Sequence, residues 1–206
     1  MKIKVLPLGT MVTNTYLVFN ERTKETVIID PAARADKIIS AVAAEDGIVK
    51  AILLTHGHYD HIGAAMEVKR AFGVRIYAHA SEKEVLNSAH YNLSEVMTGE
   101  GFAIEADEYL EDESLLELAG FTIRVIATPG HTAGGVCYLV KDGEEQCLFS
   151  GDTLFAGSVG RYDFPTSSGT ALFASIRNKL MKLPDDLKVY PGHGLPTEIG
   201  AERPHF

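Results

Sequence analysis

Seven side chains that can bind metal ions lie in four short stretches of the sequence, each beside glycine. The stretches are THGHYDHIG (55–63), TPGHTAGG (128–135), SGDTLF (150–155) and YPGHG (190–194), and their candidate ligands are His56, His58, Asp60, His61, His131, Asp152 and His193. Five imidazoles and two carboxylates form a ligand set for two divalent metal ions. Paired metal ions generate a hydroxide nucleophile at neutral pH, so this chemistry needs no serine or cysteine nucleophile.

The first stretch alone can contribute to both metal sites. His56 and His58 flank Gly57, and residues at i and i+2 of an extended backbone point to the same side. The glycine lets the chain turn tightly between them, so the pair predicts a two-pronged clamp for one ion. Asp60 and His61 follow where a helix is expected to begin, and they can turn toward a second ion.

The three remaining candidates complete this arrangement. His131 could complete the first site and His193 the second, while Asp152 could bridge, because one carboxylate can offer an oxygen to each ion. An imidazole-rich set with some carboxylate suits zinc, which we expect first, and also iron or manganese. The absence of thiolate ligands argues against a closed structural zinc site.

Each ligand stretch directly follows a β-rich segment. These four segments are Lys50–Leu54, Thr122–Ala127, Gln146–Ser150 and Lys188–Tyr190. Strand ends on one edge of a sheet bring distant parts of a sequence together on a rigid base, and loops at such edges commonly carry function. We therefore expect the four stretches to converge.

Periodicity and turn signals predict the other elements. Further strands are expected at Lys2–Leu8, Thr15–Phe19, Thr26–Asp30, Val74–Ala78, Leu115–Leu118 and Gly135–Val140, and helices at Ala33–Ala44, Ile62–Phe72 and Thr170–Lys182. Ser81 is predicted to cap a short helix that ends at Asn87, with Glu84 completing a capping box. Residues 88–113 lack periodicity and are expected to form a loop that rims a cleft.

The composition is typical of one globular domain, and we assign residues 1–206 to it. Hydrophobic residues make up 46% of the chain and charged residues 23%, enough to bury a core. The net charge of −9 argues against a nucleic-acid partner and gives no reason to expect a membrane surface. The sequence shows neither a signal peptide nor a membrane span, so a cytoplasmic location is expected. It does not indicate an oligomeric state.

Cys137 and Cys147 are predicted to be reduced, buried thiols. They flank a hairpin turn, for which a two-residue Asp142-Gly143 loop is expected. In that register Cys137 would lie opposite Leu148, so the geometry gives no support for a disulfide. A disulfide is also disfavoured in a reducing cytoplasm, and no CxxC spacing supports metal binding.

Other catalytic arrangements have little support. Residues 157–160 (GSVG) do not form the G-x-S-x-G elbow of serine hydrolases, and there is no phosphate-binding glycine motif. His79 and His205 are expected to be ordinary residues, whereas His90 is a weaker candidate for a substrate contact.

Arg161 and Tyr162 are predicted to contact the substrate. They follow Asp152 within a few residues and are expected to border the same site. Arg161 offers a planar fork for a carboxylate; the alternative is a structural arginine that pairs with Asp163 or caps loop carbonyls.

The motifs resemble those of the metallo-β-lactamase superfamily, from Leu6 to about Glu202. The resemblance rests on an HxHxDH motif followed by a lone His, an Asp and a last His. The stretches around His131, Asp152, Arg161 and His193 look most like the glyoxalase II (hydroxyacylglutathione hydrolase) branch. This implies a four-layer αββα sandwich, of class α/β (α+β), with the metals at one sheet edge. It also implies that His56, His58 and His131 bind one metal, that Asp60, His61 and His193 bind the other, and that Asp152 bridges.

One departure from that branch concerns the C-terminus. Full-length glyoxalase II enzymes carry a C-terminal helical domain that holds glutathione, but only 13 residues follow His193 here. The chain therefore resembles the short bacterial type, and hydrolysis of a thioester is better supported than glutathione specificity.

The leading hypothesis is a dimetal hydrolase of small-molecule S-acyl thioesters such as S-lactoylglutathione. A hydroxide bridging the metals would attack the acyl carbonyl, and Asp60 would orient the water and take its proton. The alternatives are hydrolysis of another ester or lactone, and a mononuclear-iron persulfide dioxygenase that uses His56, His131 and Asp152. A non-catalytic metal-binding module is disfavoured by the complete ligand set.

Overall fold

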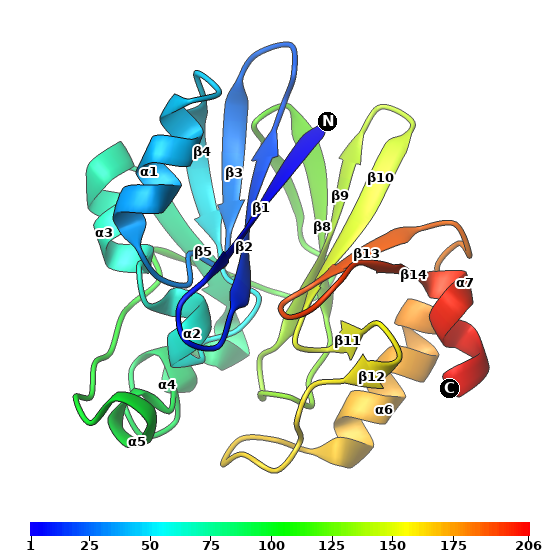
Figure 1. Ribbon diagram of the computed structural model, residues 1–206. Helices are drawn as coiled ribbons and strands as arrows, with labels where there is room; N and C mark the ends of the chain where they lie inside the picture. Colours follow the sequence, from blue (N-terminus) through cyan, green and yellow to red (C-terminus); the bar gives the residue numbers. More distant parts are fainter.

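Two six-stranded β-sheets lie face to face, and helices cover the outer face of each (Figure 1). The computed structural model describes residues 1–206. The layers run helices, sheet, sheet, helices, so the αββα sandwich expected from the resemblance is confirmed. None of the helices is both long and apolar enough to cross a membrane.

The first sheet changes from antiparallel to parallel along its width. Its strands, in spatial order, are β1 (Lys2–Leu8), β2 (Thr13–Phe19), β3 (Glu25–Ile29), β4 (Ile48–Leu53), β5 (Arg75–His79) and β6 (Glu108–Leu110). Hairpins join the first three strands, whereas β3 to β6 are parallel. Parallel neighbours need long crossovers, which α1 (Ala35–Ala43), α2 (Tyr59–Ile62) and α3 (Ala65–Phe72) provide.

The second sheet is an antiparallel meander extended by one parallel strand and, at the edge, by one short antiparallel strand. Its spatial order is β14 (Thr197–Glu198), β13 (Lys188–Pro191), β10 (Glu145–Gly151), β9 (Val136–Asp142), β8 (Phe121–Ala127) and β7 (Leu115–Leu118). The crossover between the parallel strands β10 and β13 contains the ribbon β11 (Leu154–Phe155) and β12 (Ser158–Val159), α6 (Gly169–Asn178) and the 3-10 helix η2 (Leu180–Lys182). The chain ends in α7 (Ile199–Glu202) and η3 (Arg203–His205).

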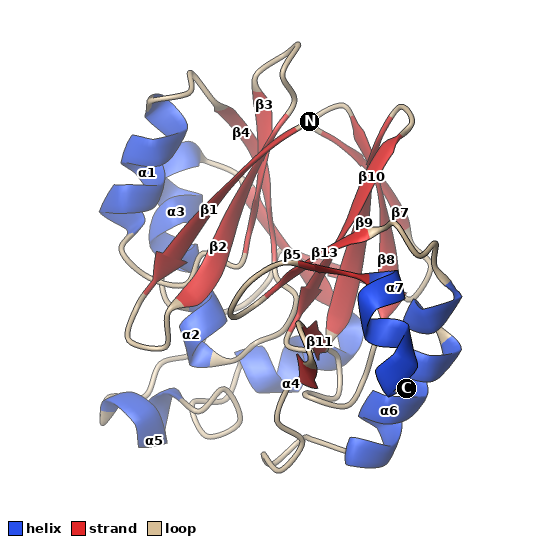
Figure 2. Cartoon of the chain, turned by 45° about the vertical axis from the view of Figure 1, so that its right-hand side comes forward, coloured by secondary structure: helices blue, strands red, loops and turns tan.

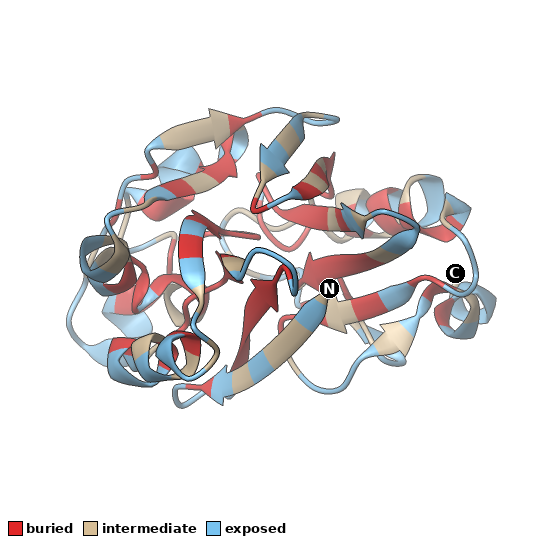
Figure 3. Ribbon diagram, turned by 90° about the horizontal axis from the view of Figure 1, so that it is seen from above, coloured by how far each residue is buried: buried red, intermediate tan, exposed pale blue.

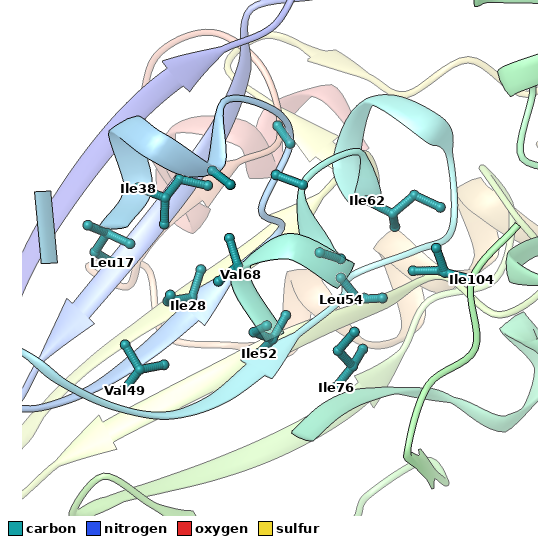
Figure 4. Packing of buried hydrophobic residues seen from close by; sticks show 14 of the residues in the cluster. Leu17, Ile28, Ile38, Val49, Ile52, Leu54, Ile62, Val68, Ile76 and Ile104 are labelled. Carbon is teal, nitrogen blue, oxygen red and sulfur yellow. The ribbon is translucent and has the colours of Figure 1, made fainter. Parts of the chain in front are cut away.

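Three apolar cores hold the four layers together. One lies between α1, α3 and the first sheet, and Figure 4 shows Leu17, Ile28 and Ile38 within it. A second lies between the sheets and contains Val18 and Phe121, and a third lies under α6. Successive side chains of a strand point to opposite faces, so Leu17 and Val18 of β2 enter different cores. Figure 3 shows buried segments along the strands between the layers.

Residues 88–113, expected to be a loop, contain regular structure. The segment includes α5 (Ser94–Thr98) as well as β6, and it follows η1 (Ala80–Glu82) and α4 (Lys83–Leu86). Buried Asn92 organises it: the side chain accepts a hydrogen bond from the Ser94 N–H (2.8 Å) and donates one to the Phe102 carbonyl (2.7 Å). Such side-chain bonds to backbone groups leave no periodic pattern in a sequence, which explains why the prediction missed α5 and β6. The rest of the segment is irregular, as expected, and its Leu93 and Met97 line a cavity.

Two local predictions near helix ends were also wrong. Ser81 does not form a capping box with Glu84; instead its N–H donates to His79 Nδ1 (3.2 Å). The helix expected over Ile62–Phe72 is divided into α2 and α3. Gly63 lies between them, and a Cβ there would come within 2.4 Å of the Ala32 carbonyl oxygen, so the close backbone approach requires glycine.

The β9–β10 hairpin turns one residue later than expected. Asp142 pairs with Glu145, so the loop residues are Gly143 and Glu144, and Cys147 pairs with Val140. Gly143 takes a positive φ of 62° at the first loop position, where a type II′ turn favours glycine. Cys137 and Cys147 are free and lie in different cores, so they face opposite sides of the sheet.

Tyr138 joins the two sheets beneath the first ligand stretch. The ring is fully buried, and its hydroxyl donates a 2.8 Å hydrogen bond to the carbonyl of Leu54. Tyr138→Phe should lower the free energy of unfolding by about 1–3 kcal/mol, because the buried carbonyl loses its donor. Urea denaturation measures this. Tyr190→Phe, at a half-buried ring, is the matched control, and an equal effect of the two changes would contradict the assignment.

Candidate metal centre

All seven candidate ligands lie at one end of the sandwich. His56 and His58 follow β4, and Asp60 and His61 belong to α2. His131 follows β8, while Asp152 and His193 follow the neighbouring parallel strands β10 and β13. Figure 2 shows α2, α4 and β11 gathered beyond the ends of the two sheets. Parallel strands place their carboxyl ends at the same edge, which explains the convergence.

The seven side chains form two groups that share Asp152. Ligand atoms of His56, His58 and His131 lie within 4.8 Å of one another, as do those of Asp60, His61 and His193. Asp152 faces both groups: its Oδ1 is 3.3 Å from His61 Nε2, and its Oδ2 is 3.5 Å from both His131 Nε2 and His193 Nε2. The separation into two groups is the one that the family resemblance implies.

Several of these atoms are buried without a hydrogen-bond partner. His56 Nε2, His61 Nε2 and Asp152 Oδ1 make no hydrogen bond, although these three residues converge on one point. A buried polar atom without a partner is costly, and a bound cation would satisfy all three atoms. Two ligand atoms about 2.0–2.1 Å from a tetrahedral ion lie roughly 3.3 Å apart. Observed separations such as 2.9 Å (His58 Nδ1 to His131 Nε2) and 3.4 Å (His193 Nε2 to Asp60 Oδ2) fit this.

Asp30 orients two of the imidazoles. Its carboxylate accepts hydrogen bonds from Thr55 N (2.7 Å), Thr55 Oγ1 (2.6 Å) and His61 Nδ1 (2.8 Å). Since the Thr55 hydroxyl proton is given to Asp30, that oxygen can accept from His56 Nδ1 at 3.1 Å. Both rings therefore donate a proton from Nδ1 and turn Nε2 toward the other ligands, the orientation in which Nε2 can bind metal.

His131 is oriented in the same way by the backbone. Its Nδ1 lies 2.7 Å from the carbonyl oxygen of Arg161, which can only accept, so the proton is on Nδ1. The lone pair of Nε2 then faces His58 Nδ1. The loop that contains Arg161 thus contributes its backbone to the site.

Glu82 joins the two loops that carry His56, His58 and His131. Its fully buried carboxylate accepts hydrogen bonds from Gly57 N (2.8 Å), Thr132 Oγ1 (2.9 Å) and Gly134 N (2.9 Å). Burial raises the pKa of Glu82 to about 7, while the three hydrogen bonds oppose that rise. Sequence reasoning missed both Glu82 and Asp30. The only available signal for Asp30 was an Asp-Pro pair at the end of a strand.

The position of His193 depends on β2. The Asn14 side chain donates hydrogen bonds to the carbonyls of Pro191 and Gly194, both at 3.0 Å, and the Tyr16 hydroxyl donates to Pro191 at 2.7 Å. These bonds cross from the first sheet to the second and hold the last ligand stretch on both sides of His193.

Charges within the second group compensate one another. Burial alone would lower the pKa of His61, but Asp152, Asp60 and Asp30 outweigh it and raise that pKa well above its usual range. Burial would likewise raise the pKa of Asp152, yet the nearby imidazoles of His61 and His193 lower it well below its usual range. The second group thus favours a positive charge beside its carboxylates, which a proton or a bound metal cation can supply.

A cavity of about 290 Å³ opens over the ligands. His58, Asp60, His131, Asp152 and His193 form part of its lining. A more open hollow of about 610 Å³ near Lys50 and Phe72 contains none of the ligands, so the smaller cavity is the relevant one.

Arg161 also lines this cavity, whereas Tyr162 and His90 do not. The Arg161 guanidinium makes two 2.9 Å hydrogen bonds to Asp163. The half-exposed Tyr162 ring packs edge-on against Phe173, and His90 packs against Tyr91.

Glu82→Gln should loosen the first group without removing a ligand. One carboxylate oxygen becomes an amide that cannot accept a hydrogen bond, so the free energy of unfolding should fall by about 1–3 kcal/mol, and metal should be lost to a chelator at lower concentration. Chemical denaturation and chelator competition measure these effects. The exposed neighbour provides the control Glu84→Gln, and Glu82 would have no such role if both variants behaved like the unchanged protein.

Comparison with known proteins agrees with this geometry. The profile of the metallo-beta-lactamase superfamily matches residues 8–193. The hydroxyacylglutathione hydrolase GloC of Haemophilus influenzae is 36% identical over 205 residues, which cover 98% of this chain and 95% of that protein.

Solved structures show the same similarity. The crystal structure of the B3 metallo-beta-lactamase BLEG-1 matches with a TM-score of 0.92 and 41% identity, covering 99% of this chain and 97% of that one. TTHA1623 in a di-iron-bound form matches with a TM-score of 0.83 and 35% identity, covering 97% and 96%. The match of the profile to most of the chain, together with these relatives, shows that the protein belongs to the metallo-beta-lactamase superfamily.

Proposed function

We propose that the protein is a metal-dependent hydrolase of S-acyl thioesters. The observation that carries the proposal is the convergence of seven donor side chains in two groups around Asp152, on the floor of a cavity. Similarity to a hydroxyacylglutathione hydrolase supports a thioester as substrate, and S-lactoylglutathione is the first compound to test.

The donors would hold two ions. His56, His58 and His131 would bind one, Asp60, His61 and His193 the other, and Asp152 both. Two such ions would lower the pKa of a bound water and polarise an acyl carbonyl. Zinc is the first expectation, and the di-iron form of a relative supports iron as well.

The protein side chains position the reactants. Asp60 lines the cavity, and its Oδ2 accepts a 2.8 Å hydrogen bond from the Thr13 hydroxyl, which restricts rotation of the carboxylate. We assign to Asp60 the orientation of the attacking water and the acceptance of its proton. Leu93 and Phe164 line the same cavity and exclude bulk water from the carbonyl, which strengthens electrostatic interactions there.

The persulfide dioxygenase alternative needs one iron and only His56, His131 and Asp152. The complete second group of Asp60, His61 and His193 favours the hydrolase. Metal counting and oxygen uptake separate the two: two ions per chain and no uptake with glutathione persulfide support hydrolysis. One iron per chain with uptake would support the dioxygenase.

His58→Ala should remove metal and activity together. The loss of kcat/KM for thioesters should exceed about 100-fold, the upper end for residues that merely orient ligands, while the circular dichroism spectrum stays unchanged. Metal analysis and thioester hydrolysis measure the two effects, and the exposed His205 gives the control His205→Ala. A metal-free His58→Ala protein with full thioesterase activity would refute the proposal.

A further inference from the structure

We propose that the cavity over the metal centre binds an apolar, uncharged chain, so that the preferred substrates are thioesters with an aliphatic or aromatic group and no carboxylate beside the scissile bond. This inference rests on the proposed function and names its substrate class. Three features of the cavity support the inference: its apolar walls, its exposed apolar rim and the pairing of its single arginine.

The walls of the cavity are apolar. They come from the turn before β2, from the α5 region, from the β11–β12 ribbon and from the loop after it, and they comprise Met11, Leu93, Met97, Phe155, Val159 and Phe164. Apart from the metal ligands and Arg161, only Tyr59 and Ser158 add polar side chains to the lining. A ligand whose carbonyl lies on the floor must therefore extend the rest of its chain along apolar side chains.

The rim continues the same apolar surface. Met11 and Val12 are 46% and 59% exposed, and Val96 and Met97 are 75% and 51% exposed. Leu195, two residues after His193, is 78% exposed. Single exposed apolar residues are ordinary, but here they lie in or beside the segments that line one cavity. A cluster of this kind is typical of a binding surface.

The walls of the cavity have no uncompensated cationic side chain for a carboxylate. Arg161 is the only lysine or arginine in its lining, and its guanidinium forms a two-bond pair with Asp163. The same guanidinium lies 4.3 Å above the ring of Phe164. Asp163 compensates the charge of Arg161, and the two side chains are 66% and 63% exposed. A substrate carboxylate would therefore gain little from this pair, but it would lose water along the apolar walls, which is costly. An uncharged chain avoids that cost.

Hydrolysis of a graded thioester series tests the acyl side. With N-acetylcysteamine as a constant neutral thiol, kcat/KM should rise about three- to fourfold per added methylene from the acetyl to the hexanoyl thioester, as expected for burial of each group. The anionic succinyl thioester should have a lower kcat/KM than the butanoyl thioester. A second series with a constant acetyl group and either glutathione or neutral alkyl thiols tests the thiol side. A preference confined to one series identifies which side of the substrate occupies the cavity.

Two variants test the assignment to these residues. Met97→Gln should reduce kcat/KM for the hexanoyl thioester at least threefold more than for the acetyl thioester. Leu115→Gln, at an exposed residue outside the cavity, should change neither value. Asp163→Asn should release Arg161 and raise kcat/KM for the succinyl ester relative to butanoyl. Flat profiles in both series, or a succinyl ester as good as butanoyl, would overturn the inference and leave the hydrolase intact.

Binding separates this inference from the proposed function. Calorimetric titration of the metal-loaded protein with non-hydrolysable amide analogues should give tighter binding of hexanoyl than of acetyl or succinyl. Tighter hexanoyl binding without turnover of any thioester would refute the thioesterase and retain the apolar site. Equal binding of the three analogues would refute the apolar site.

Discussion

The metal-binding atoms can face one another only because buried carboxylates bind the opposite sides of the imidazole rings and the loops that carry them. Asp30 fixes the tautomer of His61 directly and that of His56 through Thr55, and Glu82 joins the loops of His56, His58 and His131. Without these partners, imidazole rings at glycine-rich turns would rotate toward solvent. The metal-binding atoms then point at one another with few hydrogen-bond partners, an arrangement that a bound cation would stabilise.

The sandwich supplies the rigid frame that this arrangement needs. β2 is buried on both faces and enters two of the three cores, and Tyr138 links the sheets by a hydrogen bond just before the first ligand stretch. Ligands from both sheets therefore keep a fixed separation. The substrate cavity is less constrained, because its walls come from turns and a short helix that pack on that frame.

The sequence was sufficient for the ligand candidates and for their convergence, because glycine-flanked histidines after β-rich runs leave a local signal. The fold class followed from the family resemblance. Glu82 and Asp30 could not be found in the same way, since each is a single acidic residue whose importance arises only when separate loops meet around it. The helix α5 and the hairpin register at Gly143 were not predicted for a related reason. Side-chain hydrogen bonds to the backbone determine where α5 forms, and the turn type determines the register.

The bonds from Asn14 and Tyr16 to the backbone beside His193 have a consequence for biosynthesis. Tyr16 and the Pro191 carbonyl that it binds are 175 residues apart, so β2 is synthesised long before β13. Domains assemble as their segments emerge during translation, so a nascent chain can form the first sheet and expose six of the seven donors while one coordination position stays vacant. Full metal loading therefore waits until β13 has been synthesised and has docked on β2.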